Sequence, residues 1–125
     1  MIAVWMLIVI FFFHWLADFV WQPDWMGKTK SKDWNVLGNH SSRIGIGSAV
    51  AGFVILAILG HIDWMGLEWF IVVNAVSHFV IDAVTSRITG HYWAQERVHA
   101  FFVTIGFDQF LHMTIAVSTL AWFLV

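Results

Sequence analysis

The sequence predicts an all-α polytopic membrane protein in which four transmembrane helices form one bundle. Composition and the spacing of apolar stretches carry this prediction. Hydrophobic residues make up 60% of the 125 residues and charged residues 11%, against roughly 45–50% and about 25% in soluble globular proteins. Four apolar stretches, at about 1–21, 44–62, 67–86 and 101–125, each approach the ~20 residues that a helix needs to cross a bilayer. We therefore expect residues 1–125 to form a single membrane domain.

The first apolar stretch carries two ionisable residues, His14 and Asp18, and ends before Pro23, because proline disfavours helix at the residue that precedes it. The stretch lacks a basic leading region and is longer than the apolar region of a cleavable signal peptide, so we expect it to stay in the mature protein. Residues 22–43 are polar and should form a connection in which tryptophans anchor a short interfacial helix.

The second apolar stretch is rich in small residues. Gly45 and Ala49, and likewise Ser48 and Gly52, lie four residues apart, a spacing that lets helix backbones approach closely. We expect these residues to pack inside the bundle, and a homo-oligomer interface is the alternative. The next connection, residues 63–66, is so short that the second and third stretches should form an antiparallel hairpin.

Positive charge is confined to the connections at 22–43 and 87–100, here called the basic connections. They hold all six Lys and Arg residues: Lys28, Lys30, Lys32, Arg43, Arg87 and Arg97. The positive-inside rule then places both basic connections in the cytoplasm and both termini outside. These side chains are mainly a topology signal and contact anionic lipids, and they are also suited to hold a phosphate-bearing substrate.

Three of the four apolar stretches contain an Asp and a His four residues apart. The pairs are His14 and Asp18, His78 and Asp82, and Asp108 and His112. Four-residue spacing puts both members of a pair on one helix face. The order is reversed in the last stretch, which runs antiparallel to the other two, so the three Asp should share one level and the three His another. Because ionisable residues inside a membrane mark functional sites, we expect the pairs to converge in the cytoplasmic half.

Converging imidazoles and carboxylates are ligands for a divalent metal ion. The chain has no Cys, so the metal would be Zn²⁺ as first choice, or Mn²⁺ or Fe²⁺, without thiolate ligands. The candidate ligands are His14, Asp18, His78, Asp82, Asp108 and His112, with His40, just before the second stretch, as a further ligand. One or two ions would fit, and a bound ion would activate water for hydrolysis. Asp18, Asp82 and Asp108 are the candidate catalytic bases.

Two other interpretations use the same residues without a catalytic metal. The Asp and His side chains would form either a hydrogen-bonded layer that fixes helix packing or a proton or ion relay. Three buried carboxylates need positive partners, and the sequence offers Arg43, Arg87 and Arg97 or a bound cation. Several other polar residues fit either a supporting or a plain structural role: Gln22, Asn74 and Gln109 inside the bundle, and His61, His91 and His99 near its ends.

The segment from His14 to Met26, with the H-x-x-x-D element at 78–82 and the D-x-x-x-H element at 108–112, resembles a family of small bacterial and phage membrane proteins of unknown function. That family is similar to membrane-bound metal-dependent hydrolases. The six paired residues and His40 are the positions to which the resemblance extends. It implies a metal site in a bacterial inner membrane.

These observations lead to one preferred function and one alternative. We expect hydrolysis of a lipid-linked or phosphate-bearing substrate at the cytoplasmic side, with membrane lipids as partners and no nucleic acid. The alternative is a non-enzymatic protein, either a phage-encoded modifier of the host envelope or a proton or ion relay. In that case the Asp/His layer would be structural.

Overall fold

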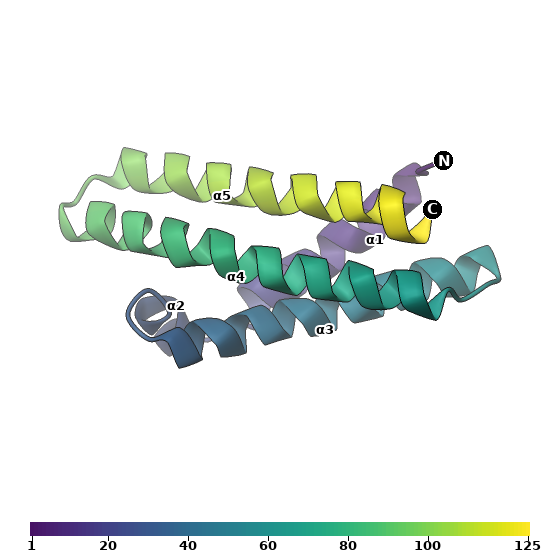
Figure 1. Cartoon of the computed structure of the whole chain (residues 1–125). Helices are drawn as coiled ribbons and strands as arrows, with labels where there is room; N and C mark the ends of the chain where they lie inside the picture. The colour runs from purple at the N-terminus through teal and green to yellow at the C-terminus, as the bar shows by residue number, and fades with distance from the viewer.

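The computed structural model describes residues 1–125 and contains only helices and short connections. Helix α1 (Val4–Trp15) continues into a π-helical turn, η1 (Leu16–Val20), and is followed by the short α2 (Asp24–Thr29). Three long helices complete the chain: α3 (Trp34–Leu59), α4 (Trp64–Ala94) and α5 (Val98–Thr119), the last extended by a second π-helical turn, η2 (Leu120–Leu124). Helices α3, α4 and α5 lie side by side in alternating direction, and α1 crosses them obliquely (Figure 1).

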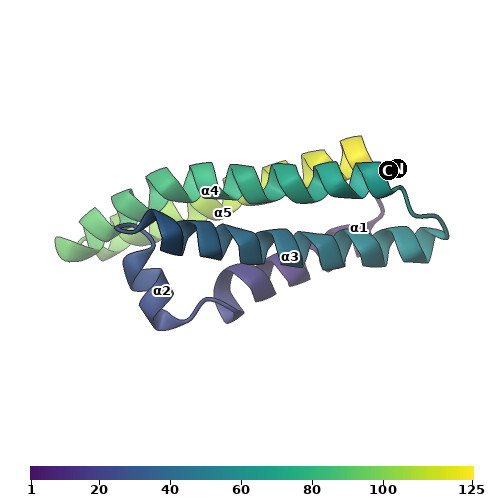
Figure 2. The same cartoon turned by 60° about the horizontal axis from the view of Figure 1, so that its bottom comes forward.

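The two basic connections lie at one end of the bundle. Figures 1 and 2 show α2 and the α4–α5 turn at that end, and both termini with the α3–α4 turn at the other. The short turn between α3 and α4 begins at Gly60, whose φ of 81° is left-handed and therefore suits glycine. The expected antiparallel hairpin of the second and third apolar stretches is formed around this turn.

Three helices are long and apolar enough to cross a membrane: α3, α4 and α5 together with η2. The segment Val4–Val20, which comprises α1 and η1, is apolar but shorter. The fold is therefore all-helical with three candidate spans. A fourth span over residues 1–21 stays a prediction.

The helices extend well beyond the predicted apolar stretches. Helix α3 begins at Trp34 instead of near residue 44, because the Asp33 carboxylate caps it by accepting the backbone N–H of Asn35 (2.8 Å). Helix α4 continues to Ala94 instead of residue 86, so the expected connection over 87–100 shrinks to a few residues. Hydropathy marks how far a helix is apolar and does not mark where the helix ends. One consequence is that His40 lies inside α3.

Helix α4 carries its apolar residues outward and its polar residues inward. One exposed row, four residues apart, consists of Val72, Val76, Val80 and Val84. On the opposite face Asn74, His78 and Asp82 are buried. In water the reverse arrangement is usual, since carboxylates are almost never buried without partners. The polarity of α4 is that of a helix whose outer face meets lipid.

The apolar core is confined to the end of the bundle that holds the termini. It consists of Met6, Ile10, Ala51, Ile55, Leu56, Leu67, Phe70, Ala116, Leu120 and Leu124. Asn74 lies next to this core, where its side-chain amide donates to the hydroxyl of Thr119 (2.8 Å). Toward the basic connections most buried side chains are polar, although Met26, Leu37 and Ile44 are buried there as well. The bundle is thus divided along its length into an apolar half and a mainly polar half, here called the polar half.

Two glycines of α3 allow close packing within the chain. A Cβ on Gly47 would lie 2.8 Å from the Cβ of Ala17 and 3.1 Å from the carbonyl oxygen of Phe13. A Cβ on Gly52 would lie 2.6 Å from Cδ1 of Leu67. Both close approaches are to helices of the same chain, in line with the expectation that these small residues pack inside the bundle.

Substituting Gly47 with alanine should lower the free energy of unfolding by about 1–3 kcal/mol, because α1 must move away from α3 to make room for the methyl group. The matched control is Gly106→Ala in α5, where no heavy atom lies within 4 Å of the added Cβ. The control should gain up to about 1 kcal/mol from helix propensity. Thermal unfolding in detergent checks both variants. Equal midpoints for the two would contradict the close contact between α1 and α3.

Candidate metal centre

Seven side chains from four helical segments meet in the polar half of the bundle. We call this set the polar layer: His14, Asp18, His40, His78, Asp82, Asp108 and His112. Segment α1–η1 contributes the first two, α3 contributes His40, and α4 and α5 contribute one pair each. His40 is 0% exposed and His78 1%. The structure thus brings together all three Asp/His pairs, with His40 among them.

The π-helical turn η1 positions Asp18. The backbone N–H of Trp21 donates to the carbonyl of Leu16 (2.8 Å), five residues back, which widens the turn. Ala17 and Asp18 are both buried: Ala17 lies against α3 at Gly47, and Asp18 enters the polar layer. Single π-turns inside α-helices occur frequently at functional sites.

Four donor atoms surround one point in the polar layer. They are Oδ1 of Asp18, Nε2 of His40, Nε2 of His78 and Oδ2 of Asp82. His40 Nε2 lies 3.0 Å from the Asp18 oxygen, 3.1 Å from His78 Nε2 and 3.4 Å from the Asp82 oxygen. His78 Nε2 lies 3.6 Å from the Asp18 oxygen and 3.4 Å from the Asp82 oxygen. A tetrahedral ion with ligands at 2.0–2.1 Å separates its ligand atoms by about 3.3–3.4 Å. These side chains are positioned to bind a metal ion.

Hydrogen bonding alone does not satisfy this arrangement. His40 Nε2 carries at most one proton, yet Asp18 Oδ1, Asp82 Oδ2 and His78 Nε2 all lie within 3.4 Å of it. Two of these three neighbours are carboxylate oxygens, which only accept when ionised. A cation at the centre would serve all of them at once. The Nδ1 atoms of His40 and His78 are buried and have no hydrogen-bond partner, so helix packing fixes the orientation of both rings.

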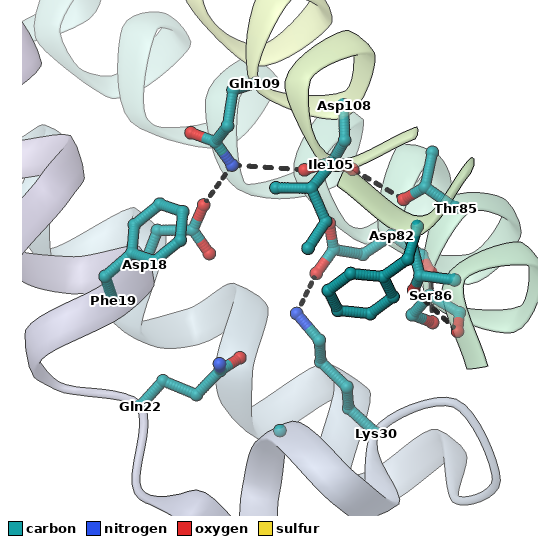
Figure 3. A pocket seen from close by; sticks show the side chains of 13 residues that line it. Asp18, Phe19, Gln22, Lys30, Asp82, Thr85, Ser86, Ile105, Asp108 and Gln109 are labelled. Atoms are coloured by element: carbon teal, nitrogen blue, oxygen red, sulfur yellow. Dashed lines mark hydrogen bonds and ion pairs between the residues drawn. The ribbon is translucent and has the colours of Figure 1, made fainter. Parts of the chain in front are cut away.

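A second group of possible ligands consists of Asp18, Asp108 and His112, whose donor atoms lie within 4.8 Å of one another. Figure 3 shows Gln109 between two of these carboxylates. Its Nε2 donates to Oδ2 of Asp18 (2.8 Å) and to Oδ2 of Asp108 (3.1 Å). The hydroxyl of Thr85 donates to Oδ1 of Asp108. Sequence reasoning missed Thr85, although its position three residues after Asp82 puts it on the same face of α4.

The other candidates from the sequence lie outside the polar layer. Asn74 packs α4 against α5 through Thr119. Gln22 lines a cavity next to Asp18 and Asp82, and its Oε1 is buried without a hydrogen-bond partner. His61 and His99 are exposed. His91 is exposed too, in the wall of a neighbouring pocket.

Lys30, and none of the arginines, pairs with the buried carboxylates. Its Nζ lies 2.8 Å from Oδ2 of Asp82 (Figure 3). The expectation that arginines would fill this role was wrong, because all three are held elsewhere. Arg43 binds the carbonyl of Trp21, Arg87 binds that of Ala83, and Arg97 stacks on Tyr92. One lysine therefore faces three buried carboxylates, and this excess of negative charge favours a bound cation.

Removing the Lys30 ammonium should strengthen metal binding, because a metal ion at Asp82 must displace the ammonium from Oδ2. We expect Lys30→Ala to bind Zn²⁺ or Mn²⁺ several-fold to about tenfold more tightly, a change of up to about 1.4 kcal/mol. Isothermal titration of the metal-free protein measures this affinity. Lys28→Ala is the control, since the side chain of Lys28 makes no ion pair with an Asp, and its affinity should not change. Weaker binding by the Lys30 variant would mean that Lys30 supports the site instead of competing for it.

Two adjoining cavities, which share wall residues such as Lys30 and Phe101, lie between the basic connections and the polar layer. The inner cavity has a volume of about 180 Å³, and Asp18, Asp82, Asp108 and Gln109 lie in its wall. The outer one, of about 860 Å³, is lined by Lys28, Lys32 and Arg87 together with aromatic side chains. Lys30 lies in the wall of both. The candidate ligands can therefore be reached from the basic end of the bundle.

The protein thus belongs to a class in which helices apolar enough to span a membrane enclose buried His/Asp groups that are positioned to bind a metal ion. Residues 6–125 match the family model described as "Protein of unknown function (DUF3307)", and the chain belongs to this family. Neither the curated proteins nor the solved structures contain a match to it.

Proposed function

We propose that this chain is a membrane-embedded, metal-dependent hydrolase that acts on a lipid-linked or phosphate-bearing substrate at the end of its basic connections. The observation that carries the proposal is the set of four converging donor atoms from Asp18, His40, His78 and Asp82. The five separations that involve a histidine are 3.0–3.6 Å, close to those between the ligands of a tetrahedral ion. The resemblance of the H-x-x-x-D and D-x-x-x-H elements to those of a family similar to membrane-bound metal-dependent hydrolases also supports a hydrolytic function.

Zn²⁺ suits this donor set best, because two imidazole nitrogens and two carboxylate oxygens are ligands that it accepts in tetrahedral geometry. Mn²⁺ and Fe²⁺ accept the same ligands. Such an ion supplies a nucleophilic water near neutral pH and polarises a phosphoryl oxygen. Asp108 lies outside the four-atom set but in the wall of the inner cavity, so with a single ion it is the carboxylate placed to accept a proton from that water.

The two cavities support an anionic substrate with an apolar part. Lys28, Lys32 and Arg87 in the outer pocket suit a phosphate group. Trp93 and Phe102, also in its wall and exposed on the outer surface, suit an acyl or prenyl chain. The inner cavity, at about 180 Å³, has room for several water molecules and thus for a small headgroup beside the ligands. Orientation in a bacterial inner membrane, with the basic end in the cytoplasm, is part of this proposal.

The proton-relay alternative needs a polar path through the whole bundle. The half that holds the termini has an apolar core from Met6 to Leu124 instead. This arrangement weighs against transport. A purely structural ion would be enclosed by protein ligands on all sides, whereas the inner cavity reaches Asp18 and Asp82.

Metal removal tests the proposal. Elemental analysis of the purified protein should find Zn, Mn or Fe, and a double variant, His78→Ala with His112→Ala, should lack the metal. Release of phosphate from phosphatidate vesicles, and of the phenol from a soluble aryl phosphate diester, should fall by more than about 100-fold after chelation and return when the metal is added back. A folded protein that neither contains nor takes up metal would overturn the proposal. A metal-loaded protein that cleaves neither probe would overturn its hydrolytic part.

A further inference from the structure

The carboxylate of Asp18 presents its two oxygens to two different sets of side chains. Oδ1 lies 3.0 Å from His40 and 3.6 Å from His78. Oδ2 lies 3.3 Å from His14 Nε2 and accepts from Gln109 at 2.8 Å. We infer that the polar layer binds two divalent ions, with Asp18 bridging them and a second position formed by His14, Asp108 and His112. This inference rests on the metal centre of the proposed function.

The second position has its own set of buried donors. His112 Nε2 lies 3.2 Å from Oδ2 of Asp108, and both residues, together with Asp18, offer ligand atoms within 4.8 Å of one another. All three residues are at most 9% exposed. Only Asp18 belongs to both this group and the four-atom set. Bundles that hold two metal ions commonly share carboxylates between them in this way.

His14 supplies an independent indication of a ligand at this place. Its side chain is 10% exposed, and its Nε2 is buried without a hydrogen-bond partner. A buried polar atom left without a partner is costly. The charged group beside this nitrogen is Oδ2 of Asp18, 3.3 Å away, the oxygen that faces the second position. An ion there would take the nitrogen as a ligand.

The stacked rings of His78 and His112 set the separation of the two positions. Their centroids are 3.9 Å apart and their planes differ by 14°. Both Nε2 atoms face Asp82, but each faces its own oxygen: His78 lies 3.4 Å from Oδ2 and His112 lies 3.1 Å from Oδ1. Because the rings are nearly parallel and both Nε2 atoms face one carboxylate, ions bound to them would be about as far apart as the rings. Metal pairs that catalyse displacements at phosphorus are about 3.5–4 Å apart.

Two ions also change the charge of the site in a way that fits its substrate. Two divalent cations exceed the charge of the three carboxylates Asp18, Asp82 and Asp108 by one unit. A phosphoryl oxygen between the ions would offset that excess, which favours phosphate esters and anhydrides as substrates. In this arrangement Asp108 would be a ligand and no longer the base, and the second ion would lower the pKa of the attacking water.

Manganese binding to the detergent-solubilised full chain tests this inference. The metal-free protein should take up two Mn²⁺ per chain, and its electron paramagnetic resonance spectrum should show a spin-coupled pair. Asp108→Asn, which keeps the side-chain size, and His112→Ala should each bind one Mn²⁺ with the spectrum of an isolated ion. His99→Ala, at an exposed position of α5, should still bind a coupled pair.

The possible results separate this inference from the proposed function. One uncoupled Mn²⁺ in the wild type would overturn the second position and leave the four-atom site intact. A folded wild type that binds neither Mn²⁺ nor Zn²⁺ would overturn both. If the folded Asp108→Asn variant still binds a coupled pair, Asp108 is not a ligand of the second position. If the folded His112→Ala variant also binds a coupled pair, the assignment of the second position is wrong.

Discussion

Replacing Asp18 with asparagine is expected to lower the affinity for divalent metal by more than about 100-fold and to abolish metal-dependent hydrolysis. Loss of a residue that only orients a metal ligand already costs about 10–100-fold in metal affinity. Asp18 is in direct reach of His14 and His40 and belongs to both groups of possible ligands. Its loss therefore affects every position at which a metal could bind.

Metal content and phosphate release, measured side by side in wild type and Asp18→Asn, check this expectation. Asp24→Asn is the matched control, since it makes the same chemical change at an exposed position at the start of α2. The control should keep its metal and its activity. If Asp18→Asn folds and keeps full metal occupancy, Asp18 is not a ligand.

Replacing Val80 with arginine is expected to prevent stable membrane insertion of α4. Val80 is 58% exposed in the middle of the outward apolar row of this helix. An arginine at the centre of a membrane-spanning helix is unfavourable by about 2.5–3.5 kcal/mol on the insertion scale, which corresponds to a factor of roughly 100 in the insertion equilibrium.

Carbonate extraction and protease protection of the expressed chain measure this insertion. Val98→Arg is the control: Val98 is 51% exposed at the first turn of α5, where the side chain can reach the interface. The control should insert as the wild type does. Normal insertion and folding of Val80→Arg would show that the outer face of α4 does not meet lipid.

The helical fold and the convergence of the three Asp/His pairs could be predicted from the sequence, because both follow from local periodicity. An apolar stretch with His and Asp four residues apart defines a helix face. The short connection after Gly60 then forces the next helix to return antiparallel. These arguments need no knowledge of packing, so they extend from sequence to structure with few assumptions.

Contacts from the polar segments were harder to predict. The sequence places His40 in the polar connection at 22–43, just before the second apolar stretch. In the structure His40 is fully buried, because α3 begins at Trp34 and carries the histidine inward. Lys30 reaches Asp82 across 52 positions of the chain, and no periodicity links a residue beyond α2 to one in α4. Such a contact depends on how the connection folds back over the bundle.

Because Lys30 lies in the wall of both cavities, it couples metal binding at the inner cavity to anion binding in the outer pocket. A divalent ion at Asp82 would displace the ammonium group, which would then add its charge to the outer pocket beside Lys28 and Lys32. Metal loading should thus increase the affinity of that pocket for anions. Since free-energy coupling between two binding equilibria is reciprocal, an anion in the pocket draws Lys30 away from Asp82 and tightens the hold on the metal by the same factor. The site would then bind its metal most firmly when substrate is present.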